Sequence, residues 1–297
     1  MNHSLSVLIP VFNCSCRDLV TALHEQLCKE AIQWEIIVAD DGSDDEQVKA
    51  ENRAICSLDN VRLIEREVNS GRAKIRNFLA SEAQYDRLLF LDGDNSLRND
   101  KFISNYLAHE TSVVYGGYDI IHDDSSLLSN LRYRYELKAE GNHSVAIRQQ
   151  RPYQNFNTKN FLVNKEVMTR FPFDERFRHY GYEDVLWGKT LCDNSIAIKH
   201  INNPVTATDF ETNEHFVRKT EEGLRTLHQF SDELQGFSPL LDYDRKIRQL
   251  HLAPLFHLMY KLLHKSLLHN LEGNNPSVFK FNIYKLLYFE ELRNKRS

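Results

Sequence analysis

Residues 87–95 read RLLFLDGDN, a short and mostly apolar run that ends in two aspartates around a glycine. Such a run, bounded by turn-forming residues, is typical of a buried β-strand. In an extended segment, side chains two residues apart point the same way at about 6.6 Å. Asp92 and Asp94 are therefore expected to reach one divalent cation, Mg²⁺ or Mn²⁺, which prefer oxygen ligands. Gly93 leaves room for the ligand. The alternative is an ordinary acidic turn.

The residues before this stretch alternate between strand and helix patterns. Short apolar runs occur at 5–11, 35–39 and 61–65, and helix-patterned segments occur at 18–30, 45–56 and 72–83. This order is typical of parallel strands joined by helices. The predicted fold class is therefore α/β, with a mostly parallel nucleotide-binding sheet flanked by helices.

Polar, turn-forming residues follow two of the other strands, at 10–13 and 40–44. In open α/β sheets, ligands bind beyond the carboxyl ends of the strands. Helix capping suffices to explain the later residues of the second segment, but not both Asp40 and Asp41. A carboxylate in this place can accept a hydrogen bond from a base N–H or from ribose hydroxyls.

Residues 69–77 read NSGRAKIRN and open a predicted helix. A helix start offers unpaired N–H groups and a favourable dipole to an anion. Arg72 and Arg76 lie four residues apart, on one helix face. The segment therefore predicts a diphosphate site, and a solvated basic helix face is the alternative.

The second half of the chain shows a less regular pattern. Strands are expected at 112–118 and 160–164, and helices at 127–140, 183–192, 214–230 and 247–271, with a loop at 238–244. The chain after about residue 203 is therefore expected to be a helical region.

Composition limits the class of protein. A net charge of −5, with Lys and Arg scattered along the chain, argues against nucleic acid as a partner, since a phosphate backbone needs a concentrated basic surface. Five cysteines without paired CxxC spacing favour reduced thiols. The first residues lack a secretory signal pattern, and no apolar run reaches the roughly 18 residues that span a bilayer. We therefore expect a cytoplasmic protein that could meet a membrane only peripherally, at its inner face.

Four motifs in this order resemble the family 2 glycosyltransferases, which have the GT-A fold: SVLIPVFN at 6–13, ADDGS at 39–43, the 69–77 segment and DGD at 92–94. The resemblance is strong over about residues 1–110. It implies a nucleotide-sugar donor, usually a UDP-sugar, and inversion at the anomeric carbon. It also suggests a role in bacterial surface polysaccharide or lipid-linked glycan assembly.

The same resemblance assigns roles to individual residues of the first 110. The implied nucleotide-sugar contacts are Pro10, Val11, Asn13, Asp40, Asp41, Arg72, Asn77, Asp92 and Gly93. Asp92 and Asp94 are implied to be the metal-binding DxD motif, with Mn²⁺ or Mg²⁺ as the cofactor.

A further match, YGYEDVLW at 180–187, resembles the acidic motif on the acceptor side of these enzymes. Inverting transfer needs one carboxylate to take the proton of the attacking hydroxyl. Asp184 is the expected base. Neighbouring residues on a helix point about 100° apart, so Glu183 is expected to bind acceptor hydroxyls or to orient the loop. Capping of a helix start is the alternative for both acids.

Residues 203–205 read NPV and resemble a subset of the family in which a histidine two residues later binds the metal. This chain has Ala207 in that place. Asp209 or His215 could replace the histidine, or the two aspartates and water could suffice. Ala207 also leaves open a catalytically inactive nucleotide-binding subunit.

Residues 251–271 form an apolar, partly amphipathic run that contains Lys261 and Lys265. Core packing or homodimerisation would explain such a run. A helix that lies on a membrane surface and meets a lipid-linked acceptor is the other hypothesis.

Together these patterns predict an inverting, metal-assisted glycosyltransferase acting on a glycan or lipid-linked acceptor. A GT-A domain is expected at 1–215, with a nucleotide-sugar half at 1–110 and an acceptor half at 111–215, followed by a helical region at 216–297. A sugar nucleotidyltransferase is an alternative, but residues 10–13 are not the Gly-rich, basic loop that it needs.

Overall fold

The computed structural model describes residues 4–122 and 124–294. Contacts divide the chain into two compact units that interleave along the sequence. The sheet unit comprises the described residues up to Ile121, Asn142–Arg178 and Trp187–Asp209. The helical unit comprises His122–Gly141, His179–Leu186 and the chain from Phe210 onward. The predicted division at residue 215 stays a prediction.

The sheet unit is built on a seven-stranded sheet of order β3-β2-β1-β4-β8-β6-β9. Its strands are β1 (Ser4–Val11), β2 (Gln33–Asp40), β3 (Val61–Glu65), β4 (Arg87–Leu91), β6 (Val113–Tyr115), β8 (Asn160–Asn164) and β9 (Ile198–His200). The first four strands of the chain pair in parallel, while β8 runs antiparallel to β4 and to β6. The predicted α/β class and mostly parallel sheet are confirmed.

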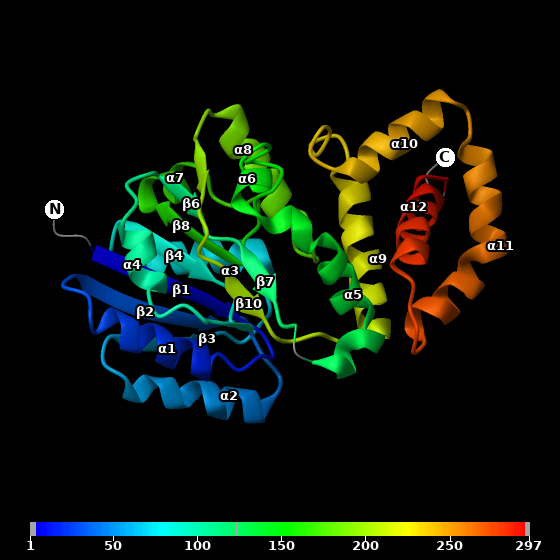
Figure 1. Cartoon of the computed structure of the whole chain (residues 1–297). Coiled ribbons are helices and arrows are strands. Elements are labelled where there is room, and N and C mark those ends of the chain that lie inside the picture. The colour runs from blue at the N-terminus through cyan, green and yellow to red at the C-terminus, as the bar shows by residue number, and fades with distance from the viewer. Residues whose placement is uncertain (1–3, 123, 295–297) are drawn as a thin grey trace. The chain divides into compact units, whose positions relative to one another are not determined.

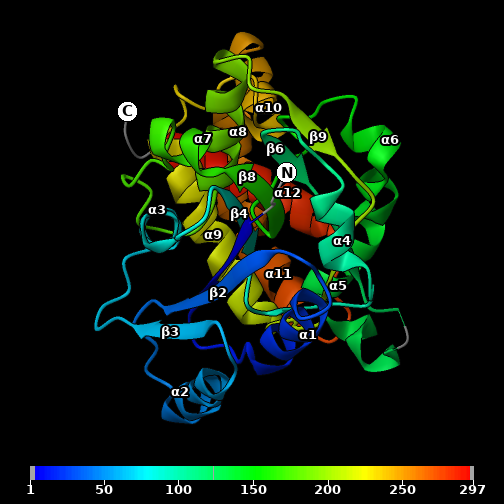
Figure 2. The same ribbon diagram turned by 90° about the vertical axis from the view of Figure 1, so that its left-hand side faces the viewer.

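Helices cover both faces of this sheet (Figure 2). The helices α1 (Arg17–Leu27) and α4 (Phe102–Leu107) lie on one face, whereas α3 (Arg72–Glu82) and α7 (Lys165–Arg170) lie on the other. Alternate residues of β1, from Leu5 to Val11, pack with apolar side chains of α1 and α4 in one core. Both faces of β1 are buried, which is why the strand carries apolar residues at nearly every position. The connection after β2 contains α2 (Glu46–Arg53) and a short 3₁₀ helix, η1 (Ala54–Ser57).

A second, three-stranded sheet has the order β5-β10-β7. It consists of β5 (Asn95–Ser96), β10 (Val205–Ala207) and β7 (Tyr118–Ile120). The single strand predicted at 112–118 is wrong: the chain turns at Gly116–Gly117, where Gly117 has φ +87°, so that β6 and β7 enter different sheets. Pairing of Ala207 with Asn95 carries the residues after β10 to the segment that follows β4.

The remaining regular elements of the described residues are helices. They are η2 (Ser125–Ser129), α5 (Leu131–Ala139), η3 (Glu140–His143), α6 (Val145–Arg148), α8 (Glu183–Asp193), α9 (Asn213–Gln229), α10 (Pro239–Gln249), α11 (Ala253–Glu272) and α12 (Val278–Asn294). Within the helical unit, α12 packs between α9 and α11 (Figure 1). The predicted helical C-terminal region is confirmed.

Two details of that region were predicted wrongly. The helix expected at 247–271 is interrupted, because α10 ends at Gln249, His251 has φ +56° and Pro254 stands in the first turn of α11. A proline fits the first turn of a helix but not its interior. The loop expected at 238–244 is instead the start of α10, where Pro239 again takes the first turn. None of the helices in residues 4–122 and 124–294 is long and apolar enough to span a membrane.

Candidate active site

The carboxyl ends of β1, β2 and β4 meet at one edge of the sheet, because these strands are parallel and adjacent. Val11, Asp40 and Leu91 are their last residues. The segment that follows β4 passes close to the end of β1: a Cβ on Gly93 would lie 2.5 Å from Val11 Cγ1 and 3.4 Å from the Pro10 carbonyl oxygen. Any larger residue would force Val11 to shift, so Gly93 packs directly against Pro10 and Val11.

Asp92 and Asp94 do not continue the strand. They lie in a turn, in which the Asn95 N–H faces the Asp92 carbonyl at 3.4 Å. The extended alternation expected at 92–94 is therefore wrong, because β4 stops at Leu91 and β5 begins at Asn95. Whether both carboxylates bind one cation stays a prediction.

Asp92 is held by cations. Its Oδ1 accepts from the Arg76 guanidinium at 2.6 Å, and the two side chains are 14% and 1% exposed. Burial alone would raise the pKa of Asp92, but the charges of Arg76, Arg72 and Lys159 outweigh it and lower the pKa. Asp92 is thus an anion paired with Arg76 and influenced by two more cations, in a place where added phosphate charge would also be favourable.

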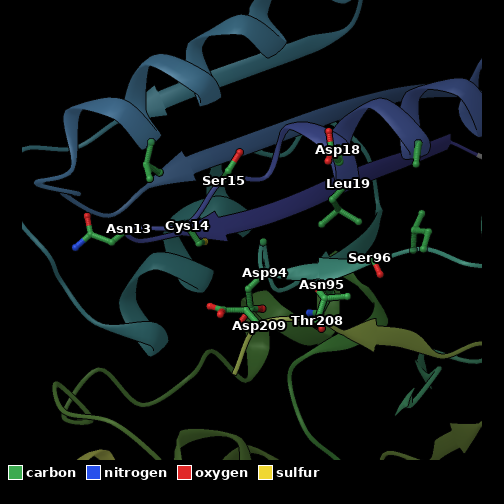
Figure 3. A pocket seen from close by; sticks show the side chains of 14 residues that line it. Asn13, Cys14, Ser15, Asp18, Leu19, Asp94, Asn95, Ser96, Thr208 and Asp209 are labelled. Atoms are coloured by element: carbon green, nitrogen blue, oxygen red, sulfur yellow. The ribbon is translucent and has the colours of Figure 1, made fainter. Parts of the chain in front are cut away.

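Asp94 lines a cavity of about 470 Å³ (Figure 3). The cavity lies between the residues after β1, the first half of α1, β5 and the residues after β10. Its polar lining consists of Asn13, Ser15, Asp18, Asp94, Asn95, Ser96, Thr208 and Asp209. In Figure 3, Asp94 and Asp209 lie next to each other at one end of the cavity.

Cys14 shows how close the acids are to one another. Burial, together with the charges of Asp94, Asp92 and Asp209, raises the pKa of its thiol to about 12. Three carboxylates therefore act on one half-buried thiol. A cation in this place would be stabilised by all three.

The oxygen-rich lining fits a hard divalent cation, which takes carboxylate and hydroxyl oxygens. Among the described residues, however, no three His, Cys, Asp or Glu side chains are close enough to hold a metal ion. An ion here would need further ligands, as Mg²⁺ commonly obtains from substrate phosphates and water. Ala207, in the place where the resembling enzymes have a histidine, belongs to β10 and offers no ligand. His215 lies in α9 of the helical unit.

The acids at the end of β2 have different surroundings. Asp41 accepts hydrogen bonds from the Ser70 and Gly71 N–H groups at 2.9 and 3.0 Å and pairs with Arg66 at 3.1 Å. It therefore fixes the entry to α3, and with it Arg72. Asp40 accepts from the Ser43 N–H through Oδ1, while its buried Oδ2 has no hydrogen-bond partner among the residues that the structure describes.

Both predicted asparagines hold loops. Asn13 has φ +50° and binds the loop after β2 through Ser43, Asp44 and Asp45. Asn77 donates to the Phe173 carbonyl at 2.9 Å and accepts from the Phe173 N–H at 2.9 Å. Their side chains therefore have structural partners, and the predicted nucleotide contacts stay predictions.

Glu183 and Asp184 begin α8 in the part of the chain assigned to the helical unit. A tight turn precedes them, with φ +92° at Gly181 and +69° at Tyr182. Glu183 is buried and Asp184 is half-buried.

Two residues near the predicted site lacked a sequence signal for a role there. Lys159 comes from the loop before β8, where its carbonyl accepts from the Asp92 N–H at 3.0 Å. Cys14 and Cys16 form a lone CxC pair, a pattern that is more often incidental than metal-binding. Pairing of β4 with β8 brings Lys159 to the site, and pairing of β1 with β4 brings Cys14 there.

Comparison with curated proteins finds glycosyltransferases. An uncharacterized glycosyltransferase of Haemophilus influenzae is 31% identical over 120 residues, which are 38% of this chain and 46% of that protein. The teichoic acid poly(glycerol phosphate) polymerase of Staphylococcus epidermidis is 30% identical over 97 residues, 32% of this chain and 13% of that protein. The matches thus cover less than half the length of these two relatives.

Among solved structures, the mannosyltransferase PcManGT from Pyrobaculum calidifontis, in complex with GDP-Man and Mn²⁺, has a TM-score of 0.56 at 12% identity, covering 98% of this chain and 86% of that one. S. aureus TarS 1-349 in complex with UDP has a TM-score of 0.51 at 16% identity, covering 99% and 92%. At these identities the likeness shows the shared GT-A fold. The family model for glycosyl transferase family 2 matches residues 6–176, more than half of the sequence. The chain therefore belongs to glycosyltransferase family 2.

Proposed function

We propose that this chain transfers a sugar from a nucleotide-sugar donor, with inversion, to a glycan or lipid-linked acceptor. The observation that carries the proposal is the arrangement after β4: Asp92 surrounded by Arg72, Arg76 and Lys159, with Asp94 on the cavity beside it. Such a site can hold a diphosphate through the cations and a metal ion through the acids. It would thereby stabilise the leaving nucleotide.

The donor is proposed to be a UDP-sugar. Two of the structures with this fold are described as bound to UDP and to UDP-GlcNAc, and a third to GDP-Man. In this chain the Asp40 Oδ2, which lacks a partner among the described residues, is a suitable acceptor for a base N–H. Asp41 is already engaged by the entry to α3, so we assign the base contact to Asp40 and the positioning of Arg72 to Asp41.

The metal is proposed to be Mn²⁺ or Mg²⁺, held by Asp94, with Asp92 nearby and Asp209 in place of the missing histidine. The ion would neutralise the leaving diphosphate. Asp184 is proposed to take the proton of the acceptor hydroxyl, and Glu183 to bind acceptor hydroxyls. We also propose a cytoplasmic location, because all five cysteines are free thiols.

The test is the change in melting temperature with UDP, UDP-sugars and GDP-mannose, each with and without Mn²⁺. A ligand at 100 times its Kd stabilises a protein by about 2.7 kcal/mol. We expect stabilisation by one nucleotide family that requires Mn²⁺, and its loss in Asp94→Asn. Nucleotide binding without any donor hydrolysis or transfer would instead favour an inactive binding subunit, the alternative that Ala207 raises. Binding of none of the nucleotides would refute both.

A further inference from the structure

Exposed apolar side chains gather on one part of the helical unit. Among the large apolar residues that the structure shows as exposed, those between positions 250 and 279 are Leu250, Leu252, Leu255, Leu258, Leu262, Leu263 and Phe279. A soluble surface normally carries such residues singly, whereas a contiguous group marks an interaction surface.

Helix α11 presents three of them in one row. Leu255, Leu258 and Leu262 are 50%, 52% and 70% exposed, and their spacing of three and four residues places them on one helix face. The opposite side of α11 is turned inward: Leu267 and Leu271 join the core of the helical unit, and His257 pairs with Glu291 of α12 at 2.6 Å. Figure 1 shows α11 in orange beside α12.

The charged residues beside the leucine row of α11 are basic, and the one acid of the helix, Glu272, is its last residue. Residues 253–271 contain no Asp or Glu, although the whole chain has a net charge of −5. Lys261 and Lys265 are both exposed and flank the leucine row on the same side, since positions 261 and 265 follow Leu258 and Leu262 by three residues each. A leucine row with basic residues beside it is complementary to a surface that is apolar inside and anionic outside.

We propose that this face, defined by Leu255, Leu258 and Leu262 with Lys261 and Lys265, binds the surface of an anionic lipid bilayer. The leucines would enter the boundary between headgroups and acyl chains, and the lysines would contact anionic headgroups. A second copy of the chain is the competing occupant. We favour the bilayer because a self-complementary interface would place each lysine pair near another one, and the only acid of α11, Glu272, lies at its last residue, beyond the leucine row.

The experiment is co-sedimentation of the full chain with vesicles of phosphatidylglycerol and phosphatidylethanolamine, and with vesicles of phosphatidylcholine alone. The wild type is expected to bind the anionic vesicles, more weakly at high salt, and to bind phosphatidylcholine much less. Leu258→Ser/Leu262→Ser should lower the partition coefficient about 30-fold, since each half-exposed leucine contributes roughly half of its full burial energy. Lys261→Gln/Lys265→Gln should lower it by about the same factor.

Matched controls lie on α5, where Leu137 and Lys138 are exposed outside the proposed face. Leu137→Ser and Lys138→Gln should leave vesicle binding unchanged. Sedimentation velocity without lipid tests the competing occupant. A dimer that the leucine substitutions dissociate, in a chain that ignores vesicles, would overturn the proposal and make this face an interface between copies. Equal binding of wild type and both double variants would also overturn it. The assay contains no nucleotide, so its failure is distinct from failure of the proposed transferase reaction.

Discussion

Substitution of Arg76 by methionine should destabilise the sheet unit by about 3 kcal/mol, the lower end of the range for breaking a buried ion pair. The Arg76 guanidinium is 1% exposed and lies 2.6 Å from Asp92. Removing it leaves the Asp92 carboxylate largely buried, although Arg72 and Lys159 still favour its charge. Those two cations are why we expect the lower end of the range.

Urea unfolding followed by tryptophan fluorescence measures this loss, because both tryptophans, Trp34 and Trp187, belong to the sheet unit. Asp92→Asn should also destabilise, since Arg76 then stays buried without its anion. The double variant Arg76→Met/Asp92→Asn should be more stable than the sum of the two single losses predicts, by about 2 kcal/mol. Arg62→Met is the control: Arg62 pairs with Glu82 at 2.9 Å but is 43% exposed, and should change stability by less than about 1 kcal/mol.

The pH dependence of the same loss gives a second readout. The pKa of Asp92 is lowered in the folded state, so the stability from the pair is fully present above the ordinary carboxyl pKa. It is lost only as the pH falls through the lowered value. The difference between wild type and Arg76→Met should therefore be constant from pH 6 to 8 and shrink in acid. A difference below about 0.5 kcal/mol at pH 7, or strictly additive single substitutions, would refute the reasoning.

Three other substitutions test separate parts of the structure. Asp40→Leu should weaken nucleotide binding at least tenfold by titration calorimetry, whereas a contact made only by Asp41 would leave the affinity unchanged. Gly93→Ala should cost about 1–3 kcal/mol of stability, since its Cβ would lie 2.5 Å from Val11 Cγ1; an unchanged melting temperature would contradict this close packing. In the helical unit, burial and the nearby Asp244 raise the pKa of Glu290 to about 7, against the charges of Arg248 and Arg293. The stability that its protonation provides is present below the unfolded pKa and falls as the pH rises through 7. Glu290→Gln should therefore flatten the fall in stability between pH 5 and 8. An unchanged slope would show that Glu290 does not cause that fall.

Local patterns predicted the part of the fold that depends on neighbouring residues. The strands at 61–65, 87–91 and 160–164 were predicted with the bounds that β3, β4 and β8 have, because apolar runs between turn residues specify buried strands. The break after Gln249 was missed, since the apolar period continues across it and only Pro254 interrupts the pattern.

The candidate site was predictable where it depends on strand ends and not where it depends on pairing at long range. The acids after β2 and β4 follow from the sequence, but the engagement of Asp41 by Ser70 and Gly71 does not. Likewise, a period-two pattern cannot show that 92–94 is a turn, or that Lys159 lies beside Asp92. These features arise when separate segments pack together, which no single window of sequence contains.

The antiparallel pairing of β5 with β10 has a consequence for synthesis of the chain. Ser96 and Thr206 are 110 residues apart in sequence, so at 5–20 residues per second a ribosome adds β10 roughly 5–20 s after β5. During that interval the emerging polypeptide already carries Asp92 and Asp94, but the wall formed by Thr208 and Asp209 does not yet exist. A nucleotide with Mn²⁺ should therefore protect arrested nascent chains from proteolysis only when the arrest point allows residues beyond 209 to leave the ribosome.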